Sequence, residues 1–403
     1  MEKRVKSLLL VLNFICAALS FAAPITAIHF EGLKKTKDFI LQRDIKSFIQ
    51  KEADEKTIHE LETLLQKEEI FSEIELVQTE SEAGVEITAK VKEKITFIPF
   101  PIFSVSEGSA MGGAFVLDTN AFGLKHSFVV GGYFSALEYR AIFMYGKPPR
   151  GHAPGLSVYG SIGKKNQIYV NTDEYECIDY KMFSGNIGLV LTEIFTDYFL
   201  ASLSTNFGFK DFDARKKGNI SSNRYVDLEP SLKFHVSDWN GVFMSTKSFE
   251  YKHESVIYTD CYIWHIFSPR ILVQQPLLTD DLRFVFNANG VHSKFIPYSA
   301  YVGNSQLGVN ILPTKFGTRS GVGLSAGFEY ATFKTKVGLF SLYGVYQCVK
   351  VEDFDTEYKF NQGVGFGTTL YLKQIAIPAM NFGIYYNATK STVYSRFSIG
   401  MSL

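Results

Sequence analysis

The chain has 403 residues, of which 41 are Lys or Arg and 41 are Asp or Glu, so its formal net charge is zero. This balance excludes the basic footprint of a nucleic-acid-binding protein. After the first residues, no stretch offers the ~20 consecutive apolar residues that a membrane-spanning helix needs. Aromatic residues make up 15% of the chain and glycine occurs 32 times. That composition fits either a soluble β-sandwich or a transmembrane β-barrel.

The N-terminus is typical of a secretory signal. Three positive charges within the first six residues precede a mostly apolar stretch, Leu8–Leu19, which ends in small residues. The pattern predicts a signal peptide over residues 1–22. A lipoprotein signal ending at Cys16 is the alternative, but the isoleucine before it is too large for that position. The three cysteines that follow are odd in number and far apart, which does not predict a disulfide framework.

Residues 24–93 are predicted to form a small α+β domain in the order strand, helix, helix, strand, strand. Apolar residues recur at helical spacing in two segments, for which Thr36 or Asp38, and then Asp54, are candidate N-caps. After Phe71 the apolar period changes to two, which predicts a β-hairpin.

Residues 94–403 show a different pattern, in which apolar residues alternate with small or polar ones. Val322–Tyr330 and Val364–Leu372 carry apolar residues mainly at even positions, with glycine prominent at the odd ones. The prolines of Ile98–Ile102 predict a boundary that is neither helix nor central strand. About sixteen alternating segments follow, and an even number lets a sheet close without edges that lipid cannot hydrogen-bond. The predicted fold is therefore mainly β: an antiparallel transmembrane barrel of about sixteen strands after one small α+β domain.

Several motifs carry a family resemblance. Ile28–Thr36, Ile70–Leu76 and Val91–Glu93 are similar to the strands of a polypeptide-transport-associated (POTRA) domain. Gly112–Gly123 is similar to a first barrel strand with its Asn-x-Phe-Gly turn, and Gly363–Gly367 to a late strand. The chain thus resembles the outer-membrane assembly factor superfamily, the BamA/TamA-like surface antigen barrels with a POTRA domain, whose relatives include two-partner-secretion transporters.

The resemblance implies a loop folded into the barrel, whose Arg-Gly-aromatic tip pairs with an acidic residue on the inner wall. The corresponding stretch, Leu312–Thr318, supplies only Lys315 as a cation, and Leu342–Tyr346, where the family usually has an Asp, carries no acid. Glu329 is then the predicted substitute partner. The loop-lock candidates are Lys315, Phe316, Gly317 and Glu329. A single POTRA-like domain is a second departure, since assembly factors usually carry several.

A lateral seam is expected between the first and last barrel strands, where small residues would weaken the pairing. The seam candidates are Gly112, Gly113, Ala114 and Gly400. A client strand would add to the exposed edge there. The alternative is a seam as tight as any other, because glycine is common on barrel walls.

Two further sites are predicted. The POTRA-like domain would offer a client the sheet edge at Ile74, Leu76 and Val77; a passive spacer or a docking site for another protein is the alternative. The C-terminal signal by which the barrel is itself inserted comprises Tyr394, Phe397, Ile399, Met401 and Leu403.

Motifs for a catalytic or metal site are weak in this sequence. Gly323–Gly327 matches a nucleophile elbow with Ser325 as nucleophile, but alternation continues through it where that motif needs a tight turn. The eight histidines lack ligand spacing, and His265 beside Trp264 suggests an aromatic girdle. The acidic residues of 352–357 suggest a solvated loop. We therefore expect neither an enzyme nor a cofactor or metal.

The predicted function is to assist the insertion or translocation of other polypeptides at the outer membrane, with the N-terminal domain in the periplasm. The expected partners are outer-membrane lipid, unfolded outer-membrane or secreted polypeptides, and periplasmic accessory proteins, without nucleic acid. The alternatives are a passive outer-membrane pore and a dedicated secretion transporter of the two-partner type. Client identity and oligomeric state are not encoded in any recognisable pattern.

Overall fold

The computed structural model describes residues 23–67, 70–106, 109–149, 153–196, 198–216, 222–240, 243–259, 262–277, 281–293, 296–297, 300–335, 338–354, 356–372 and 378–399. The chain divides into two compact units: residues 1–98 with 118–126, and residues 99–117 with 127–403. The predicted signal peptide lies outside the described residues. None of the described helices is long and apolar enough to cross a bilayer.

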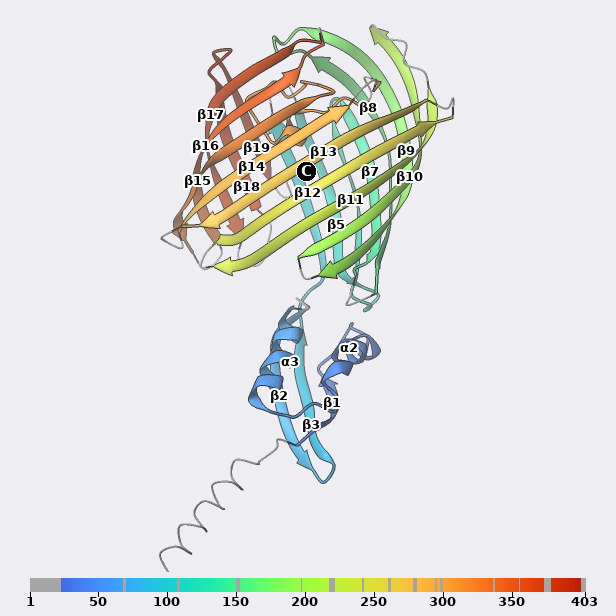
Figure 1. The fold of residues 1–403 in the computed structure, drawn as a ribbon, viewed down its shortest axis with the longest axis vertical. Coiled ribbons are helices and arrows are strands. Elements are labelled where there is room, and N and C mark those ends of the chain that lie inside the picture. Colours follow the sequence, from blue (N-terminus) through green and yellow to red (C-terminus); the bar gives the residue numbers. More distant parts are fainter. Residues whose placement is uncertain are drawn as a thin grey trace, which may run out of the picture. The chain divides into compact units, whose positions relative to one another are not determined.

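The first unit contains the predicted α+β domain (Figure 1). Its elements are β1 (Ile25–Glu31), α2 (Asp38–Ile45), the 3₁₀-helix η1 (Lys46–Phe48), α3 (Glu55–Lys67), β2 (Phe71–Ser81) and β3 (Gly84–Glu93). The sheet order is β1-β3-β2, with β1 parallel and β2 antiparallel to the central β3. The predicted β-α-α-β-β order is confirmed.

The core of this unit follows from the two apolar periods of its sequence. Alternate residues of β3 and the apolar faces of the helices form one buried cluster, which includes Ile28, Leu41, Leu61, Ile87 and Ala89. Burial of such side chains is the main stabilising contribution in a domain of this size.

The two predicted helix caps have different outcomes. Asp54 Oδ1 accepts a hydrogen bond from the Thr57 backbone N–H at 2.7 Å, which confirms the cap of α3. The prediction for α2 was wrong, because its N-cap is Lys37, which makes no side-chain cap hydrogen bond. Thr36 accepts a hydrogen bond from the side-chain amide of Asn120 instead.

A buried polar network joins residues 33–37 to the rest of the first unit. The Glu93 carboxylate accepts hydrogen bonds from the backbone N–H groups of Lys35 and Thr36, both at 2.8 Å. Partial burial pushes the Glu93 pKa upward, but these hydrogen bonds prevail and hold the pKa below its ordinary value. Lys35 Nζ also lies 2.7 Å from the Asp118 carboxylate, and Lys125 Nζ lies 2.9 Å from Asp44.

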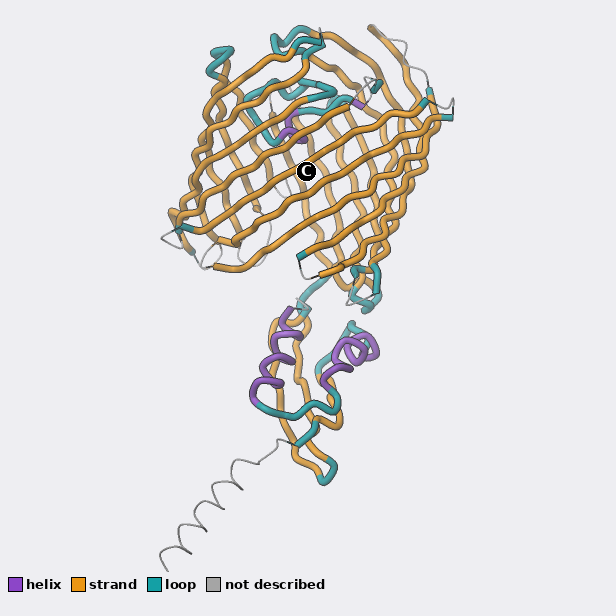
Figure 2. Tube along the Cα trace, in the orientation of Figure 1, coloured by secondary structure: helices purple, strands orange, loops and turns teal. Residues whose placement is uncertain are grey.

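The second unit is dominated by a closed antiparallel barrel of sixteen strands, so the predicted fold class is confirmed (Figures 1 and 2). The strands are β4 (Phe97–Ser106), β5 (Ser109–Ala121), β6 (His126–Ser135), β7 (Glu138–Lys147), β8 (Gly155–Val170), β9 (Glu176–Thr196), β10 (Phe199–Lys216), β11 (Asn223–Asn240), β12 (Phe243–Tyr258), β13 (Ile263–Pro276), β14 (Leu282–Ser293), β15 (Gly321–Lys334), β16 (Gly338–Glu352), β17 (Tyr358–Leu372), β18 (Pro378–Asn387) and β19 (Thr392–Ile399).

The barrel has two ends that differ in their connections. Because successive strands are antiparallel, connections 171–175, 294–320, 353–357 and 388–391 share one end, which we call the loop end. The opposite end, with connections such as 122–125, is the turn end. β4 begins at the turn end.

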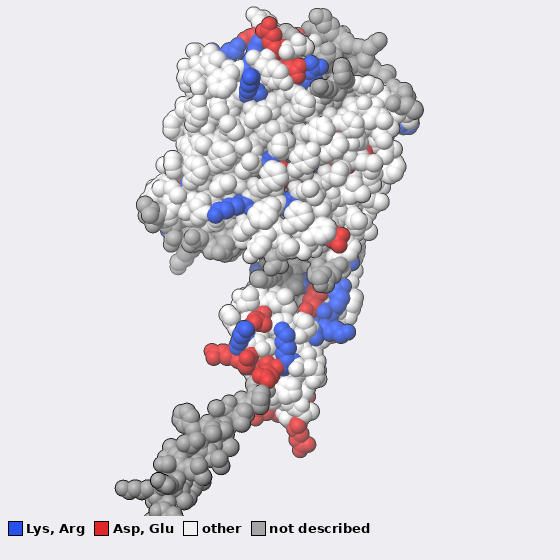
Figure 3. Space-filling model, viewed as in Figure 1, with Lys and Arg blue, Asp and Glu red and all other residues white. Residues whose placement is uncertain are grey.

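The predicted alternation places large apolar side chains on the outer face of the barrel. Val322, Phe328 and Tyr330 of β15 are about half exposed, whereas Glu329 between the latter two is buried. On β9 the outward side chains between Lys181 and Glu193 are apolar or glycine. This stretch of Phe183–Leu191 matches the ~9–11 residues with which a tilted strand spans the hydrocarbon core of a bilayer. Charged side chains are correspondingly sparse on the barrel wall in Figure 3 and gather at the loops.

Polar side chains tie the inner face of the same wall together. Arg140, Ser161, Asn186, Asn206 and Asp227 lie on successive strands from β7 to β11 and are joined side chain to side chain by hydrogen bonds of 2.6–3.1 Å. Since each group faces the lumen and has a partner, the ladder braces the wall and satisfies buried polar atoms.

Candidate functional site

The barrel closes where β19 meets β4, and the described residues of this seam pair over four positions. The described pairing joins Arg396–Ile399 to Phe103–Ser106, whereas β8 and β9 pair over the whole length of β8, from Gly155 to Val170. Phe103 and Phe397 pack edge to face across the seam, with ring centroids 6.4 Å apart.

The sequence of β4 is unusual for a barrel strand. Pro99 and Pro101 lie within β4, so the stretch Ile98–Ile102, expected to be neither helix nor central strand, forms part of the first barrel strand. Proline has no N–H to donate to a ladder and is tolerated mainly in edge strands. Here both prolines precede Phe103, where the described pairing with β19 begins. The turn-end half of the first barrel strand therefore lacks two N–H donors.

The predicted seam glycines lie on a different strand. Gly112, Gly113 and Ala114 belong to β5, the second barrel strand, because β4 precedes it. Gly112 still borders the seam strand, since a Cβ on it would lie 4.0 Å from the Phe103 ring. Gly400 lies outside the described residues.

The predicted C-terminal signal residues do not share one face of β19. Tyr394 is buried, and its hydroxyl donates to Glu174 at 2.9 Å, whereas Phe397 faces Phe103 across the seam. Ile399 pairs with Phe103 at the end of the described strand. Met401 and Leu403 lie outside the described residues.

The connection between β14 and β15 folds into the lumen, as the resemblance implied (Figure 2). It contains the short helix α4 (Asn304–Leu307), and its side chains Leu307, Ile311, Leu312 and Phe316 are at most 1% exposed. Asn387 on β18 donates to the Ile311 carbonyl at 2.8 Å. The loop thus occupies the lumen near the loop end and is held by the wall.

The loop also holds its own shape. Asn304 Nδ2 donates to the carbonyls of Leu312 and Pro313, at 2.7 and 2.9 Å. Gly308 ends α4 in the left-handed conformation with φ 68°, and a Cβ there would collide with the amides of Asn287 and Asn289. A glycine is therefore required at this close approach to β14.

The tip candidates bind to β8. The Val170 backbone N–H donates to the Lys315 carbonyl at 3.0 Å, and Phe316 forms a parallel bridge with Val170. A Cβ on Gly317 would collide with the Tyr169 ring, which shows how closely the tip approaches the wall. Lys315, Phe316 and Gly317 therefore do form the docked tip, through backbone and shape.

The predicted Lys315–Glu329 pair does not form. Glu329 instead accepts hydrogen bonds from Arg283 at 2.9 and 2.6 Å and from the Tyr371 hydroxyl at 2.8 Å. Arg283 stands directly opposite Glu329 in the β14–β15 register, whereas Lys315 lies beside β8 on another part of the wall. Because Arg283 is the cross-strand neighbour of Glu329, it can pair with the buried carboxylate without any displacement of the inserted loop. Sequence reasoning missed Arg283 because alternation shows which residues face inward and does not fix which are opposite.

Charged and polar side chains cross the loop end. From the β8–β9 connection, Thr172 Oγ1 donates to Asp353 at 2.7 Å, and Asp173 pairs with Lys390. Lys359 Nζ lies 2.9 Å from Asp353. We call these three contacts, together with Tyr394–Glu174, the mouth clamp. It links the β8–β9 connection to strands that lie next to the seam.

The mouth clamp corrects the expectation of a solvated acidic loop. The Asp353 side chain is 1% exposed. Burial pushes its pKa upward, but hydrogen bonds from Thr172 and Lys359 hold the pKa below its ordinary value. Glu352 pairs with Arg319 of the inserted loop, and Asp355 lies outside the described residues.

The remaining candidates have simple positions. Ile74, Leu76 and Val77 lie on β2, which is an edge of its sheet because it pairs only with β3 there. Ser325 lies inside the continuous strand β15, so no nucleophile elbow forms at it. Trp264 was wrongly expected in a girdle, since it is 3% exposed and faces the lumen core.

These features define a class: a sixteen-stranded transmembrane-type barrel with an inward-folded loop and one POTRA-like domain. Solved structures share this fold. The chain is similar to BamA from Haemophilus ducreyi lacking POTRA domains 1-3, with a TM-score of 0.67 and 12% identity over 94% of this chain and 84% of that one. CdiB from Escherichia coli matches with a TM-score of 0.67 and 12% identity over 94% and 77% of the two chains. CdiB from Acinetobacter baumannii matches at 0.64 and 12% over 95% and 74%.

At the level of sequence, no protein-family model and no curated protein matches the chain. With identities of 12%, the structural matches establish the fold. The structure therefore establishes the barrel, its strand number and its inserted loop. The activity has to be argued from the site itself.

Proposed function

We propose that this protein is an outer-membrane barrel that assists the insertion or translocation of other polypeptides, with its POTRA-like domain in the periplasm. The observation that carries the proposal is the closing strand pair β4 and β19, in which β4 carries Pro99 and Pro101, two residues that cannot donate a ladder hydrogen bond. The motif resemblance to outer-membrane assembly factors and the shared fold with BamA and CdiB support it.

The seam would act by strand addition. When β4 and β19 part, each offers a row of unpaired backbone groups to a client strand. In hydrocarbon no water can satisfy those groups, so a client strand that adds to the edge is strongly favoured over an open seam. Hydrogen bonds exchange and no covalent bond changes, so the proposed activity needs neither a catalytic residue nor a cofactor.

The edge strand β2 is a second place for a client to bind. β2 carries the half-buried residues Ile74, Leu76 and Val77 along an edge of a three-stranded sheet, and the backbone of this edge suits transient addition of an unfolded strand. Periplasmic accessory proteins would dock on the same domain.

A passive pore is the competing function, and two observations disfavour it. Leu307, Ile311 and Phe316 of the inserted loop fill part of the lumen, and the mouth clamp crosses the loop end. A wide, steady conductance would require both to move. A transporter for one dedicated partner would have the same seam and the same fold. The number of different clients that the protein accepts would distinguish it from a general insertion factor.

The direct test follows the folding of an unfolded client barrel into liposomes with and without the purified protein. The proposal predicts faster client folding in its presence. A variant with Lys315 and Phe316 changed to Ala would lower that acceleration, because it loosens the tip at Val170. Correctly folded protein that accelerates none of several clients would contradict the proposal.

A further inference from the structure

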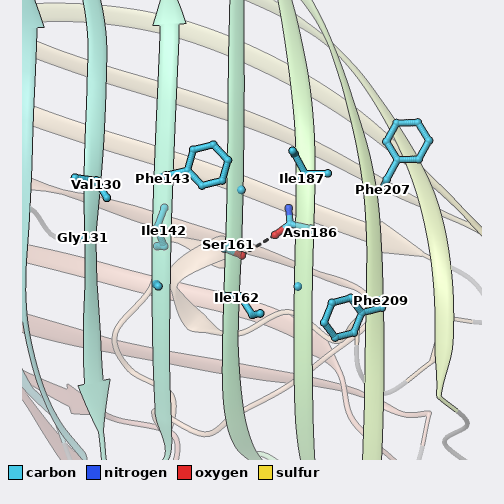
Figure 4. Close-up of a pocket in the computed structure, with 13 residues that line it drawn as sticks. Val130, Gly131, Ile142, Phe143, Ser161, Ile162, Asn186, Ile187, Phe207 and Phe209 are labelled. Atoms are coloured by element: carbon cyan, nitrogen blue, oxygen red, sulfur yellow. Dashed lines mark hydrogen bonds between the residues drawn. The ribbon is translucent and has the colours of Figure 1, made fainter. Parts of the chain in front are cut away.

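Large apolar side chains dominate the outer wall of the barrel. At strands β7 to β10 the outward side chains are mainly apolar, and the hydrogen bond between Ser161 and Asn186 lies on the lumen side (Figure 4). Examples of the exposed outward side chains are Phe143, Ile187 and Phe207. Such a distribution is expected where lipid offers no hydrogen-bond partner. A cluster of three polar side chains on the outer face of β12 and β13 departs from it.

The cluster consists of His253 and Ser255 on β12 and His265 on β13. Odd-numbered residues of β12 face outward, as the exposed Phe249 and Ile257 show, and His253 and Ser255 lie between them on the same face. Ser255 and His265 are register partners. The two histidines are 12 residues apart in the chain. The expectation of no metal site relied on spacing along the chain, whereas antiparallel pairing brings these side chains together.

The three side chains converge on one point. His253 Nε2 lies 3.2 Å from His265 Nδ1, and Ser255 Oγ lies 3.3 Å from the first nitrogen and 3.0 Å from the second. The three atoms therefore form a nearly equilateral triangle. The ligand atoms of a tetrahedral ion with bonds of ~2.0–2.1 Å are ~3.3–3.4 Å apart, so the triangle has the size of one face of such a coordination sphere.

Hydrogen bonds alone satisfy this triangle only in part. A neutral imidazole nitrogen either donates or accepts, and a hydroxyl has one proton, so at most two of the three edges can be hydrogen bonds. The third edge is then a close approach of two electronegative atoms without a proton between them. A cation accepts a lone pair from all three atoms and removes this conflict.

The same geometry argues against a catalytic role for Ser255. In a serine hydrolase the histidine uses one ring nitrogen for the serine and the other for the residue that orients it. Here His265 Nδ1 contacts both Ser255 Oγ and His253 Nε2, so no relay runs through the ring. Convergence of all three atoms on one point is the arrangement of metal ligands.

Packing holds these ligands in place. The His253 ring stacks on Phe267, its register partner on β13, with ring centroids 4.5 Å apart and an interplanar angle of 15°. Because two ligands lie on one strand and the third on its partner, the backbone ladder also fixes their spacing. Ligands that are already positioned lose little conformational entropy on binding.

The donor atoms select the class of ion. Imidazole nitrogens suit Zn²⁺, Ni²⁺ and Cu²⁺, whereas Mg²⁺ and Ca²⁺ prefer oxygen ligands. Among the residues that the structure describes, no group of three His, Cys, Asp or Glu side chains is arranged to hold a metal, so two imidazoles and one hydroxyl are the whole set and water would complete it. His265 is exposed and lies two residues from Ile263, where β13 begins at the loop end, so ions can reach the site from that end.

We propose that His253, His265 and Ser255 bind a transition-metal dication of the Zn²⁺ class on the outer face of the barrel. A bound ion would link β12 to β13 near the loop end. The proposal involves neither the seam nor a client strand, and it is independent of the proposed polypeptide activity.

The test is Zn²⁺ binding by the full-length protein, folded in detergent micelles and titrated in a calorimeter. One Zn²⁺ per protein is expected, without comparable binding of Mg²⁺. His253→Gln and His265→Gln should each lower the affinity by at least about tenfold, since loss even of a residue that orients a metal ligand typically costs about 10–100-fold. His292→Gln is the matched control and should leave the affinity unchanged, because the exposed His292 of β14 contacts Ser320 instead.

A second measurement needs no variant that has to fold. Histidines of the wild-type protein are labelled with diethylpyrocarbonate, with and without Zn²⁺, and the labelled peptides are measured by mass spectrometry. Zn²⁺ should protect His253 and His265 and leave His292 labelled. Zn²⁺ binding that survives the change of both histidines, equal loss of affinity in His292→Gln, or equal labelling with and without Zn²⁺ would overturn the proposal.

Discussion

At the scale of single residues, the inward and outward faces of strands were predictable and the partners were not. Glu329 was correctly expected on the inner wall, because it alternates with the outward Phe328 and Tyr330. Its partner turned out to be Arg283, which lies 46 residues earlier in the chain. A period of two fixes the face of a residue, but the offset between neighbouring strands depends on turns whose geometry the sequence does not show.

The Arg283–Glu329 pair should matter for stability. Arg283→Met leaves a buried carboxylate without its cation, which costs about 3–5 kcal/mol. Urea unfolding of the folded barrel should show a lower midpoint. The double variant with Glu329→Met also changed should recover most of the loss, because no uncompensated charge remains. An Arg283→Met midpoint equal to that of the wild type would contradict this role.

The carboxylate of Glu93 predicts a pH dependence in the POTRA-like domain. Its pKa is lowered in the folded state, so its contribution to stability is complete above the unfolded value of ~4.3 and is lost as the pH falls through the lowered pKa. Hydrogen exchange at the amides of Lys35 and Thr36, corrected for intrinsic rates, should lose protection in acid. Glu93→Gln should show low protection already at pH 7. Wild-type protection in that variant would refute the assignment.

At the scale of elements, β15 up to Tyr330 and β17 up to Leu370 show why most strands could be predicted, because their mainly apolar outward side chains alternate with glycine, polar or charged residues. β4 could not, because Pro99 and Pro101 exclude it from the ordinary strand pattern. The inserted loop was expected from family resemblance, but its docking on Val170 was not. Backbone bridges between distant segments leave no periodic trace in the sequence.

The mouth clamp is an element whose opening can be measured. Asp353→Asn removes the charge that holds Lys359, and hydrogen bonds to charged groups contribute ~1.5–3 kcal/mol. Single-channel recordings in planar bilayers should therefore show opening events at least about tenfold more often. Glu193→Gln, on the outer wall, is the control. Identical recordings for Asp353→Asn and wild type would show that the clamp does not limit conductance.

At the scale of the whole molecule, domain order and strand number were predictable because both follow from patterns summed over many residues. The site was predictable only in part. A weak pairing between the closing strands stays a prediction, and its candidate glycines were assigned to β5, one strand too late. The pairing of β4 with β19 is a property of barrel closure and emerges only when the sixteen strands are assembled.

The most direct test of this account is to lock the seam. In a background without native cysteines, Ser104 and Ser398, which are register partners across the seam, are both changed to Cys. Ser202 and Thr192, partners across β10 and β9, give the matched control. Oxidation of the seam pair should abolish the acceleration of client folding in liposomes, and reduction should restore it, while the control pair has no effect. Full acceleration with the seam cross-linked would contradict the proposal that clients pass through β4 and β19.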